Sequence, residues 1–252
     1  KTQTGFFETS PFVPPTPSTF TFDAWGQAFE RLEQGLVNSL LFTIPATVLS
    51  ATLGSLVAYG LTNTKWRGQA FVLVLLIAGI FIPYQSVLVP LSRFWSIVDV
   101  ASLFAWLEPV ANREGLVALA VTHTAYGIPI TTLLFRAHYQ ALDDSMLEAA
   151  RLDGASIAKI YARIILPLSI PMFAVALIYQ FTNIWNDLLF ALVLVQNPAN
   201  DVVTMSLTSL QGSMVSQYNL QMAGAFITAL PTLLVYIFFG EQFAEGVAGG
   251  GA

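Results

Sequence analysis

The sequence predicts an all-α protein, a polytopic bundle of transmembrane helices. Two observations carry this prediction. Apolar residues make up 55% of the 252 positions and charged residues 10%, and the mean hydropathy of +0.67 lies outside the range of soluble domains. The few charged residues are also absent from long stretches of the chain. Ten Lys and Arg are too few to form the charged surface that a soluble protein of this size needs. We therefore expect lipid to cover much of the surface.

Five charge-free stretches are each long enough to span a bilayer. About 20 apolar residues, at a rise of about 1.5 Å each, cross a hydrocarbon layer of about 30 Å. A helix also satisfies its own backbone groups in that layer. The five predicted spans are 34–64, 68–92, 115–135, 164–186 and 202–240, the last being most apolar over 222–240.

The distribution of positive charge predicts the orientation. Lys65 and Arg67 occupy one short turn, and four more positive residues lie between the third and fourth spans: Arg136, Arg151, Lys159 and Arg163. These two connections should face the cytoplasm. By alternation the N-terminal segment lies outside and the C-terminus inside. An external N-terminus without a signal sequence predicts a sixth, N-terminal helix before residue 1.

The predicted organisation has three parts. Residues 1–33 form an extracytoplasmic segment that includes the loop sequence PFVPPTPSTFTF, and residues 34–240 form the transmembrane domain. Within that domain, residues 137–167 form the longest cytoplasmic connection. Residues 241–252 form a cytoplasmic Gly-rich tail that carries Glu241 and Glu245 but no positive charge, so a flexible end is as compatible with it as a partner contact.

Several functions are excluded by what the sequence lacks. It has no Cys and only two His, which leaves no thiolate metal site or thiol nucleophile. There is no phosphate-binding GxxxxGK[ST] loop, no HExxH and no sequence context for a catalytic triad. A net charge of -5 without a basic stripe argues against nucleic acid. We expect no catalytic residue, no metal site and no cofactor bound by this chain.

The cytoplasmic connection DDSMLEAARLDGASIAKIYARIILPLSIP predicts a helix, a turn and a second helix. Ser145 and Glu148 have the spacing of a capping box, so the first helix should start near Met146. Asp143 and Asp144 suit its positive end. Gly154 can end the helix in the left-handed conformation, Ser156 can cap the next helix, which leads through Ile164 into the fourth span, and Pro167 suits a first turn.

The same connection carries a specific resemblance. EAARLDG, nine further residues and IILP reproduce the EAA signature of binding-protein-dependent ABC importer permeases, which have the type I importer fold. The resemblance implies that the first helix is a coupling helix seated in a groove of a cytoplasmic ATPase. The residues that match are Glu148, Ala149, Ala150 and Gly154, with Asp153 beside them and Ile164, Leu166 and Pro167 following. An ordinary interfacial hairpin would need the same cap and glycine, but it would not explain the whole spacing.

Other stretches resemble carbohydrate permeases of the maltose-transporter type. They include FIPYQSVLVPL, NIWNDLLFALVL and HTAYGIPITTLLFR, the last most similar to the glucose and mannose branch. The resemblance implies a multi-pass protein of the prokaryotic cytoplasmic (inner) membrane that works by alternating access. It also implies a second, homologous permease, two ATPase subunits that use ATP and Mg, an extracytoplasmic sugar-binding protein and a sugar as cargo.

Polar side chains within the spans are candidates for the substrate pathway, because such groups usually face a bundle interior. Asp187 could instead lie at the outer interface, since the 20 residues that separate it from Pro167 span about 30 Å as helix. A single histidine in a span is also often a packing group. The candidates are Asn183, Trp185, Asn186 and Asp187 in the fourth span, with Gln85, His123 and Tyr126 elsewhere.

Two alternatives stay open at the level of sequence. An ABC importer could carry a solute other than a sugar, such as glycerol phosphate. A stand-alone secondary transporter should show internal repeats and paired charges within its spans, and this sequence shows neither.

Overall fold

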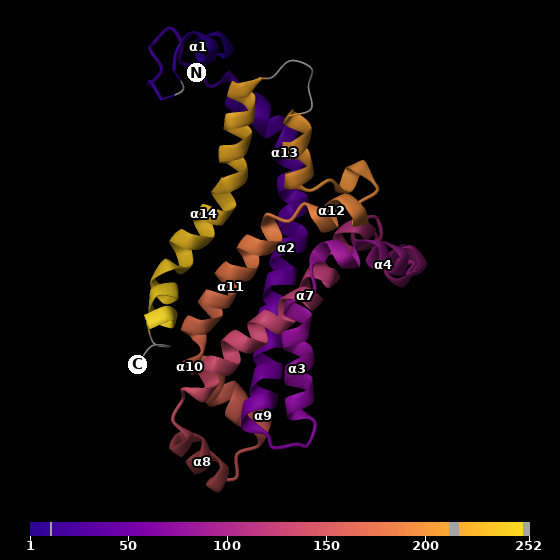
Figure 1. Ribbon diagram of the computed structural model, residues 1–252, viewed down its shortest axis with the longest axis vertical. Helices are drawn as coiled ribbons and strands as arrows, with labels where there is room; N and C mark the ends of the chain where they lie inside the picture. Colours follow the sequence, from indigo (N-terminus) through magenta and orange to yellow (C-terminus); the bar gives the residue numbers. More distant parts are fainter. Residues whose placement is uncertain (11, 212–216, 249–252) are drawn as a thin grey trace. The chain divides into compact units, whose positions relative to one another are not determined.

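The computed structural model describes residues 1–10, 12–211 and 217–248, and within these ranges the regular elements are helices (Figure 1). The α-helices are α1 (Gln3–Glu8), α2 (Asp23–Asn63), α3 (Gln69–Ile80), α4 (Tyr84–Ile97), α5 (Val100–Leu103), α6 (Glu108–Ala111), α7 (Glu114–Gln140), α8 (Asp144–Leu152), α9 (Ile157–Ile160), α10 (Leu166–Leu168), α11 (Ile170–Trp185), α12 (Leu189–Leu194), α13 (Val203–Gln211) and α14 (Tyr218–Ala248). A π-helical turn, η1 (Tyr161–Ile165), joins α9 to α10, and a 3-10 turn, η2 (Pro198–Asn200), precedes α13.

By length and composition, three helices can cross a membrane, and the count reaches the five predicted spans when each of two bent helix pairs is taken as one span. The three single helices are α2, α7 and α14, and each pair is interrupted by a short break. One broken pair is α3 with α4, and the other joins Ile157–Leu168 to Ile170–Trp185.

The breaks correct the prediction of continuous helices in the second and fourth spans. The second span breaks between α3 and α4, where Pro83 has no backbone N–H. The fourth bends by 75° at Ser169. Pro167 lies in the first turn of α10, as expected, but the long helix α11 begins only at Ile170 and has Pro171 in its first turn. Prolines on both sides of Ser169 remove two donors, so the α-helix cannot run straight through.

The helix ends also differ from the predicted boundaries. The helix of the first span begins at Asp23 rather than at 34, and α14 continues through Gly240 to Ala248, so most of the predicted tail is helical. The last four residues of that tail, 249–252, lie outside the described residues. At Gly246 the extended helix packs closely against α11, since a Cβ there would collide with the Pro171 carbonyl. The predicted boundaries were too short because apolar runs indicate only the part of a helix that lipid covers. The helices themselves continue into polar sequence.

The chain forms two compact units. The first comprises Lys1–Phe42, Leu88–Leu119 and Trp185–Leu234. Its core is built around side chains with almost no exposure, including Leu32, Phe190 and Val203. Buried polar groups fix the segment before α13: the Ser39 hydroxyl accepts the Val203 N–H at 2.8 Å, and the Asn38 amide donates to the carbonyls of Ala199 and Asp201.

The second unit comprises Thr43–Val87, Ala120–Ile184 and Val235–Ala252. Gly54 of α2 faces Thr131 of α7, and a Cβ at Gly54 would overlap the threonine side chain. The Thr131 hydroxyl lies 2.9 Å from the Ser50 carbonyl oxygen and 2.8 Å from that of Gly127, so it binds across the two helices and along its own. Small and hydroxyl-bearing residues thus let α2 and α7 approach closely, as is common between membrane helices.

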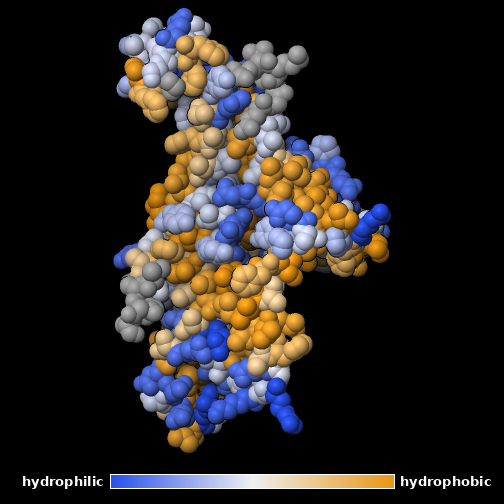
Figure 2. Space-filling view, viewed as in Figure 1, coloured by the Kyte–Doolittle hydropathy of each residue, from blue (hydrophilic) through white to orange (hydrophobic). Residues whose placement is uncertain are grey.

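Apolar side chains cover the outside of several helices. The structure describes all residues of α3, and none of them is buried. In α14, Ile237 and Phe238 are 74% and 73% exposed. In the space-filling view, apolar residues cover much of the visible surface, and hydrophilic ones gather around α8 at its lower end and in further patches elsewhere (Figure 2). This pattern suits lipid or partner helices rather than water.

We predict opposite effects for two glycine substitutions in α2. Gly54→Ala should destabilise the fold by about 1–3 kcal/mol, because the new methyl group overpacks the contact with Thr131. Gly60→Ala has nothing within 4 Å of its Cβ and should stabilise the helix by about 0.5–1 kcal/mol. Thermal unfolding of the two variants in detergent would measure both effects. Equal midpoints would contradict the close packing at Gly54.

Candidate functional site

The EAA segment, residues 143–168, begins at a helix cap that differs from the predicted one. The N-cap of α8 is Asp143, whose carboxylate accepts the Ser145 N–H at 2.9 Å. The capping box of Ser145 and Glu148 is therefore not the cap, and the helix starts two residues before Met146. This hydrogen bond lowers the pKa of Asp143. A carboxylate suits the N-cap because it faces unpaired N–H groups and the positive end of the helix dipole.

The C-terminal end of α8 confirms the role expected for Gly154. Its φ is +75°, the only positive φ among the described residues. The Gly154 N–H donates to the Arg151 carbonyl and the Ala155 N–H to the Ala150 carbonyl, each at 3.0 Å, which is the Schellman pattern. A Cβ at Gly154 would meet nothing within 4 Å. The requirement for glycine here is therefore conformational rather than steric.

The second half of the segment is short and irregular. Ser156 caps α9 as predicted, accepting the Lys159 N–H at 3.3 Å. The chain then passes through the π turn η1, which contains Ile164, and through α10, which contains Leu166 and Pro167. At the bend, the Ser169 hydroxyl donates to the Ile165 carbonyl at 2.6 Å. A π turn followed by a bend makes this the least regular part of the fourth span.

Helix α8 has one anchored face and one open face. Leu147 is 2% exposed and packs in the core of the second unit. Glu148, Ala149 and Asp153 are exposed, and Leu152 is 89% exposed. The large apolar side chain of Leu152 can insert into a pocket of a partner protein, and the small Ala149 beside it allows the partner to approach closely. Leu152 is not among the site residues predicted from the sequence, because its exposure depends on which face of α8 is buried.

A group of hydroxyls joins the EAA segment to two membrane helices. The Ser55 hydroxyl lies 2.6 Å from the Tyr139 hydroxyl and 2.8 Å from that of Tyr161; we call these three residues the hydroxyl cluster. Beside it, the Tyr59 hydroxyl donates to the Ile157 carbonyl at 3.0 Å. Helix α2, the end of α7 and the π turn thus meet at one place. Sequence reasoning missed this cluster, since its members lie far apart in the chain.

A small polar cavity of about 40 Å³ lies within the second unit. It brings together three of the predicted pathway residues, His123, Tyr126 and Asn183. Sequence reasoning did not select the other polar lining residues, Tyr84, Tyr179 and Gln180. Gln85, a fourth candidate, is exposed and does not line the cavity.

The hydrogen bonds of Gln180 hold one wall of this cavity in place. Its amide donates to the Ser50 hydroxyl at 3.0 Å and links α11 to α2. Gly127 leaves the space that this amide occupies, because a Cβ there would collide with it. The Gln180 side chain of the cavity wall is therefore held in place by α2 and α7.

The remaining pathway candidates belong to the first unit and have structural partners there. Trp185 is 1% exposed and its indole N–H donates to the Thr228 carbonyl at 3.0 Å. Asp187 accepts the Phe190 N–H at 3.1 Å, and its own carbonyl accepts the Thr204 hydroxyl. Helix α11 ends at Trp185, so Asp187 lies in the connection to α12, where its carboxylate accepts an N–H from the first turn of that helix. Asn186, between them, is exposed.

The described residues hold no group of three or more His, Asp or Glu side chains placed to bind a metal ion. The candidate functional site consists of the EAA segment and the cavity.

Residues 50–243 match the family model described as the binding-protein-dependent transport system inner membrane component. The chain belongs to this family. The match includes all of the EAA segment and the cavity residues, so the features described above lie inside the region that defines the permease family.

Two relatives and one solved structure illustrate the similarity. The xylose/arabinose import permease protein XacI of Haloferax volcanii is 46% identical, over 98% of this chain and 83% of the relative. The glucose import system permease protein GlcU of Saccharolobus solfataricus is 30% identical, over 95% of this chain and 82% of the relative. A bacterial ABC transporter for the import of alginate has a chain that matches with a TM-score of 0.71 at 18% identity, over 95% of this permease and 85% of that chain. The structural match shows a shared fold.

Gly154 provides a test of the local geometry. Gly154→Ala should weaken the end of α8 by about 1–2 kcal/mol, because alanine is strained at positive φ. Gly154→Asn should have a smaller effect, since asparagine tolerates this conformation better. Hydrogen exchange of the backbone amides of residues 149–155 would report the loss of protection. The same protection in Gly154→Ala as in the wild type would contradict the assignment.

Proposed function

We propose that this chain is the membrane-spanning permease subunit of an ATP-driven importer that carries a sugar, with a pentose as the first candidate. Membership of the binding-protein-dependent family supports import driven through an external binding protein. The 46% identity to a xylose/arabinose import permease, higher than the 30% to a glucose import permease, favours a pentose over glucose. The predicted glucose and mannose branch remains a prediction that the same experiments test.

The exposed face of α8 is proposed to dock on a cytoplasmic ATPase. Its small and acidic residues, Ala149, Glu148 and Asp153, are open, and Leu152 projects from the same short helix. The buried Leu147 packs α8 into the core of the second unit, and the hydroxyl cluster connects the π turn of the EAA segment to α2 and α7. Motion of the ATPase would therefore act on membrane helices rather than on a loose loop. This chain supplies no residue for hydrolysis, which belongs to the ATPase.

The orientation, the other partners and the substrate path complete the proposal. The connections with Lys65, Arg67 and Arg151 face the cytoplasm, and the N-terminal segment faces outward. A second, homologous permease, two ATPase subunits and an external sugar-binding protein complete the transporter. His123, Tyr126 and Asn183 line part of the path, because they are polar side chains that share a cavity inside membrane-spanning helices.

The assembled transporter in lipid vesicles tests the cargo. With its binding protein present, we expect xylose or arabinose to stimulate ATP hydrolysis and uptake at least ten-fold, and glucose, mannose and maltose to do so less. Stimulation by glycerol phosphate alone would keep the importer and remove the sugar. ATP-independent uptake would contradict the proposal in favour of a secondary transporter.

The same uptake assay tests the path. Asn183→Val should slow uptake several-fold, because Asn183 lines the cavity. Asn186→Val is the matched control, since Asn186 is also exposed but does not line the cavity. Equal rates in the two variants would remove Asn183 from the path.

A charge on the open face of α8 should uncouple the transporter. We predict that Leu152→Asp lowers sugar-stimulated ATP hydrolysis at least ten-fold, because an unpaired carboxylate would enter an apolar contact with the ATPase. Leu152 is 89% exposed in this chain, so the fold itself should tolerate the change. Leu103→Asp, at a leucine 61% exposed in another connection, is the matched control. If both variants keep full activity, the docking face lies elsewhere.

A further inference from the structure

A pocket in the first unit lies away from the EAA segment and contains none of the predicted site residues. Its volume is about 390 Å³, within the range of about 300–1,000 Å³ that is typical of small-molecule sites. Three segments line it: the end of α4 with the turn into α5, the start of α7, and the chain from α12 to η2. Sequence reasoning had no signal for this pocket, since each segment adds only a few residues.

The floor of the pocket is apolar and closely packed. Val100, Ala118 and Leu194 line it and are each less than a tenth exposed. Gly115 makes the floor possible, because a Cβ there would lie 3.3 Å from the Leu194 carbonyl oxygen and from the Val195 Cα. The start of α7 therefore lies directly against the end of α12.

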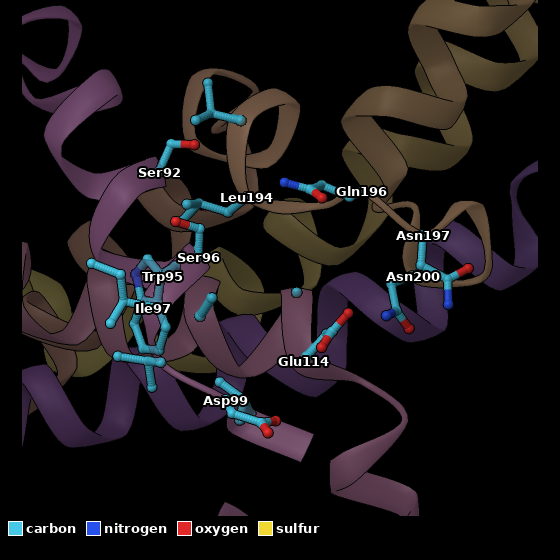
Figure 3. Close-up of a pocket in the computed structure, with 15 residues that line it drawn as sticks. Ser92, Trp95, Ser96, Ile97, Asp99, Glu114, Leu194, Gln196, Asn197 and Asn200 are labelled. Carbon is cyan, nitrogen blue, oxygen red and sulfur yellow. The ribbon is translucent and has the colours of Figure 1, made fainter. Parts of the chain in front are cut away.

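The walls combine one aromatic ring with carboxylates, carboxamides and hydroxyls. In the view of Figure 3, Trp95 lies on one side of the pocket, Asn197 and Asn200 lie on the other, and Glu114 and Gln196 lie between them. Asp99 and the hydroxyls of Ser92 and Ser96 complete the polar lining. Among the described residues that line the pocket there is no Lys or Arg.

Hydrogen bonds already orient several of these polar groups. The Asp99 carboxylate accepts the Ser102 N–H at 3.0 Å, and the Asn197 side-chain oxygen accepts the Ala199 N–H at 3.0 Å. Asn200 is 2% exposed, and its amide donates to the Asn112 carbonyl at 3.4 Å. Side chains fixed before a ligand arrives lose little conformational entropy when it binds.

We infer that this pocket binds a neutral sugar of pentose or hexose size directly to the permease. Carboxylates only accept hydrogen bonds, whereas carboxamides both donate and accept, so the best ligand offers groups that do both. Sugar hydroxyls meet that requirement, and the indole of Trp95 gives an apolar surface for the C–H face of the ring. At about 30 Å³ for each water molecule in the liquid, the pocket holds roughly a dozen water-sized groups, which fits one sugar ring.

A basic side chain of a docked protein fits the lining less well. Lysine and arginine are donors only, so they would pair with Asp99 and Glu114 and leave the amide N–H groups of the carboxamides unpaired. A metal ion has no group of three suitable ligands among the described residues. The inference rests on the proposed import of a sugar and adds a binding site to it that does not depend on the binding protein.

Direct binding to the assembled permease and ATPase complex, in lipid and without the binding protein, tests the inference. We expect radiolabelled D-xylose or D-glucose to bind saturably in equilibrium dialysis. Trp95→Leu and Glu114→Gln should each weaken this binding at least ten-fold. Glu114 is exposed, so its variant should fold even if Trp95→Leu does not. The matched controls are Trp106→Leu and Glu108→Gln, because both residues are exposed in a neighbouring segment and do not line the pocket.

The outcomes separate this inference from the proposed function. Normal sugar uptake with binding protein, together with no direct binding or with binding unchanged in both pocket variants, would overturn the sugar pocket and leave the importer intact. Pocket variants that lose only the attachment of the binding protein would identify a docking surface instead and would also overturn it. A wild-type transporter that takes up no sugar at all would remove the proposed cargo first, and this pocket with it.

Discussion

In the hydrocarbon layer, backbone N–H and C=O groups have no water to bind, and each group left unpaired costs several kcal/mol. Helices satisfy this constraint along most of the chain, and hydroxyl side chains satisfy it where helices approach each other or bend. Thr124, Thr131 and Thr228 donate to carbonyls four residues earlier in their own helices. The hydroxyls of these threonines are satisfied within their own helices. The side chains therefore add no charge to a span and do not prevent neighbouring helices from packing closely.

The same constraint decides where a span can break. At the bend of the fourth span, Pro167 and Pro171 cannot donate, and the Ser169 hydroxyl donates to the Ile165 carbonyl that the bend would otherwise expose. The π turn η1, which precedes α10, widens the helix before the bend. An irregular backbone at this depth is tolerated only when it is covered by protein, and Ile165 is fully buried in the core of the second unit.

Local features of the chain were predictable from sequence, and features that depend on distant residues were not. The spans, Gly154 at positive φ and the Ser156 cap follow from short patterns. The cap at Asp143 was missed because Asp143 and Ser145 are both good caps, and local sequence alone did not decide between them. The hydroxyl cluster needed residues 55, 139 and 161 to be brought together by packing. Trp185 and Asp187 share their polarity with pathway residues, and only their hydrogen bonds to Thr228 and Phe190 reveal a structural role.

The EAA segment combines a rigid part with a part that can yield. Helix α8 is fixed at one end by the Asp143 cap, at the other by the Schellman turn, and through its middle by Leu147 in a close-packed core. A displacement of α8 would therefore also displace the residues packed around Leu147, because close-packed cores resist local deformation. The hydroxyl cluster would pass the displacement to α2 and α7, which are joined through Gly54 and Thr131. The π turn and the bend at Ser169 interrupt the path into α11. Under the proposed coupling, a change in the angle of α11 would take place at this interruption, and it would alter the cavity that α4, α7 and α11 line.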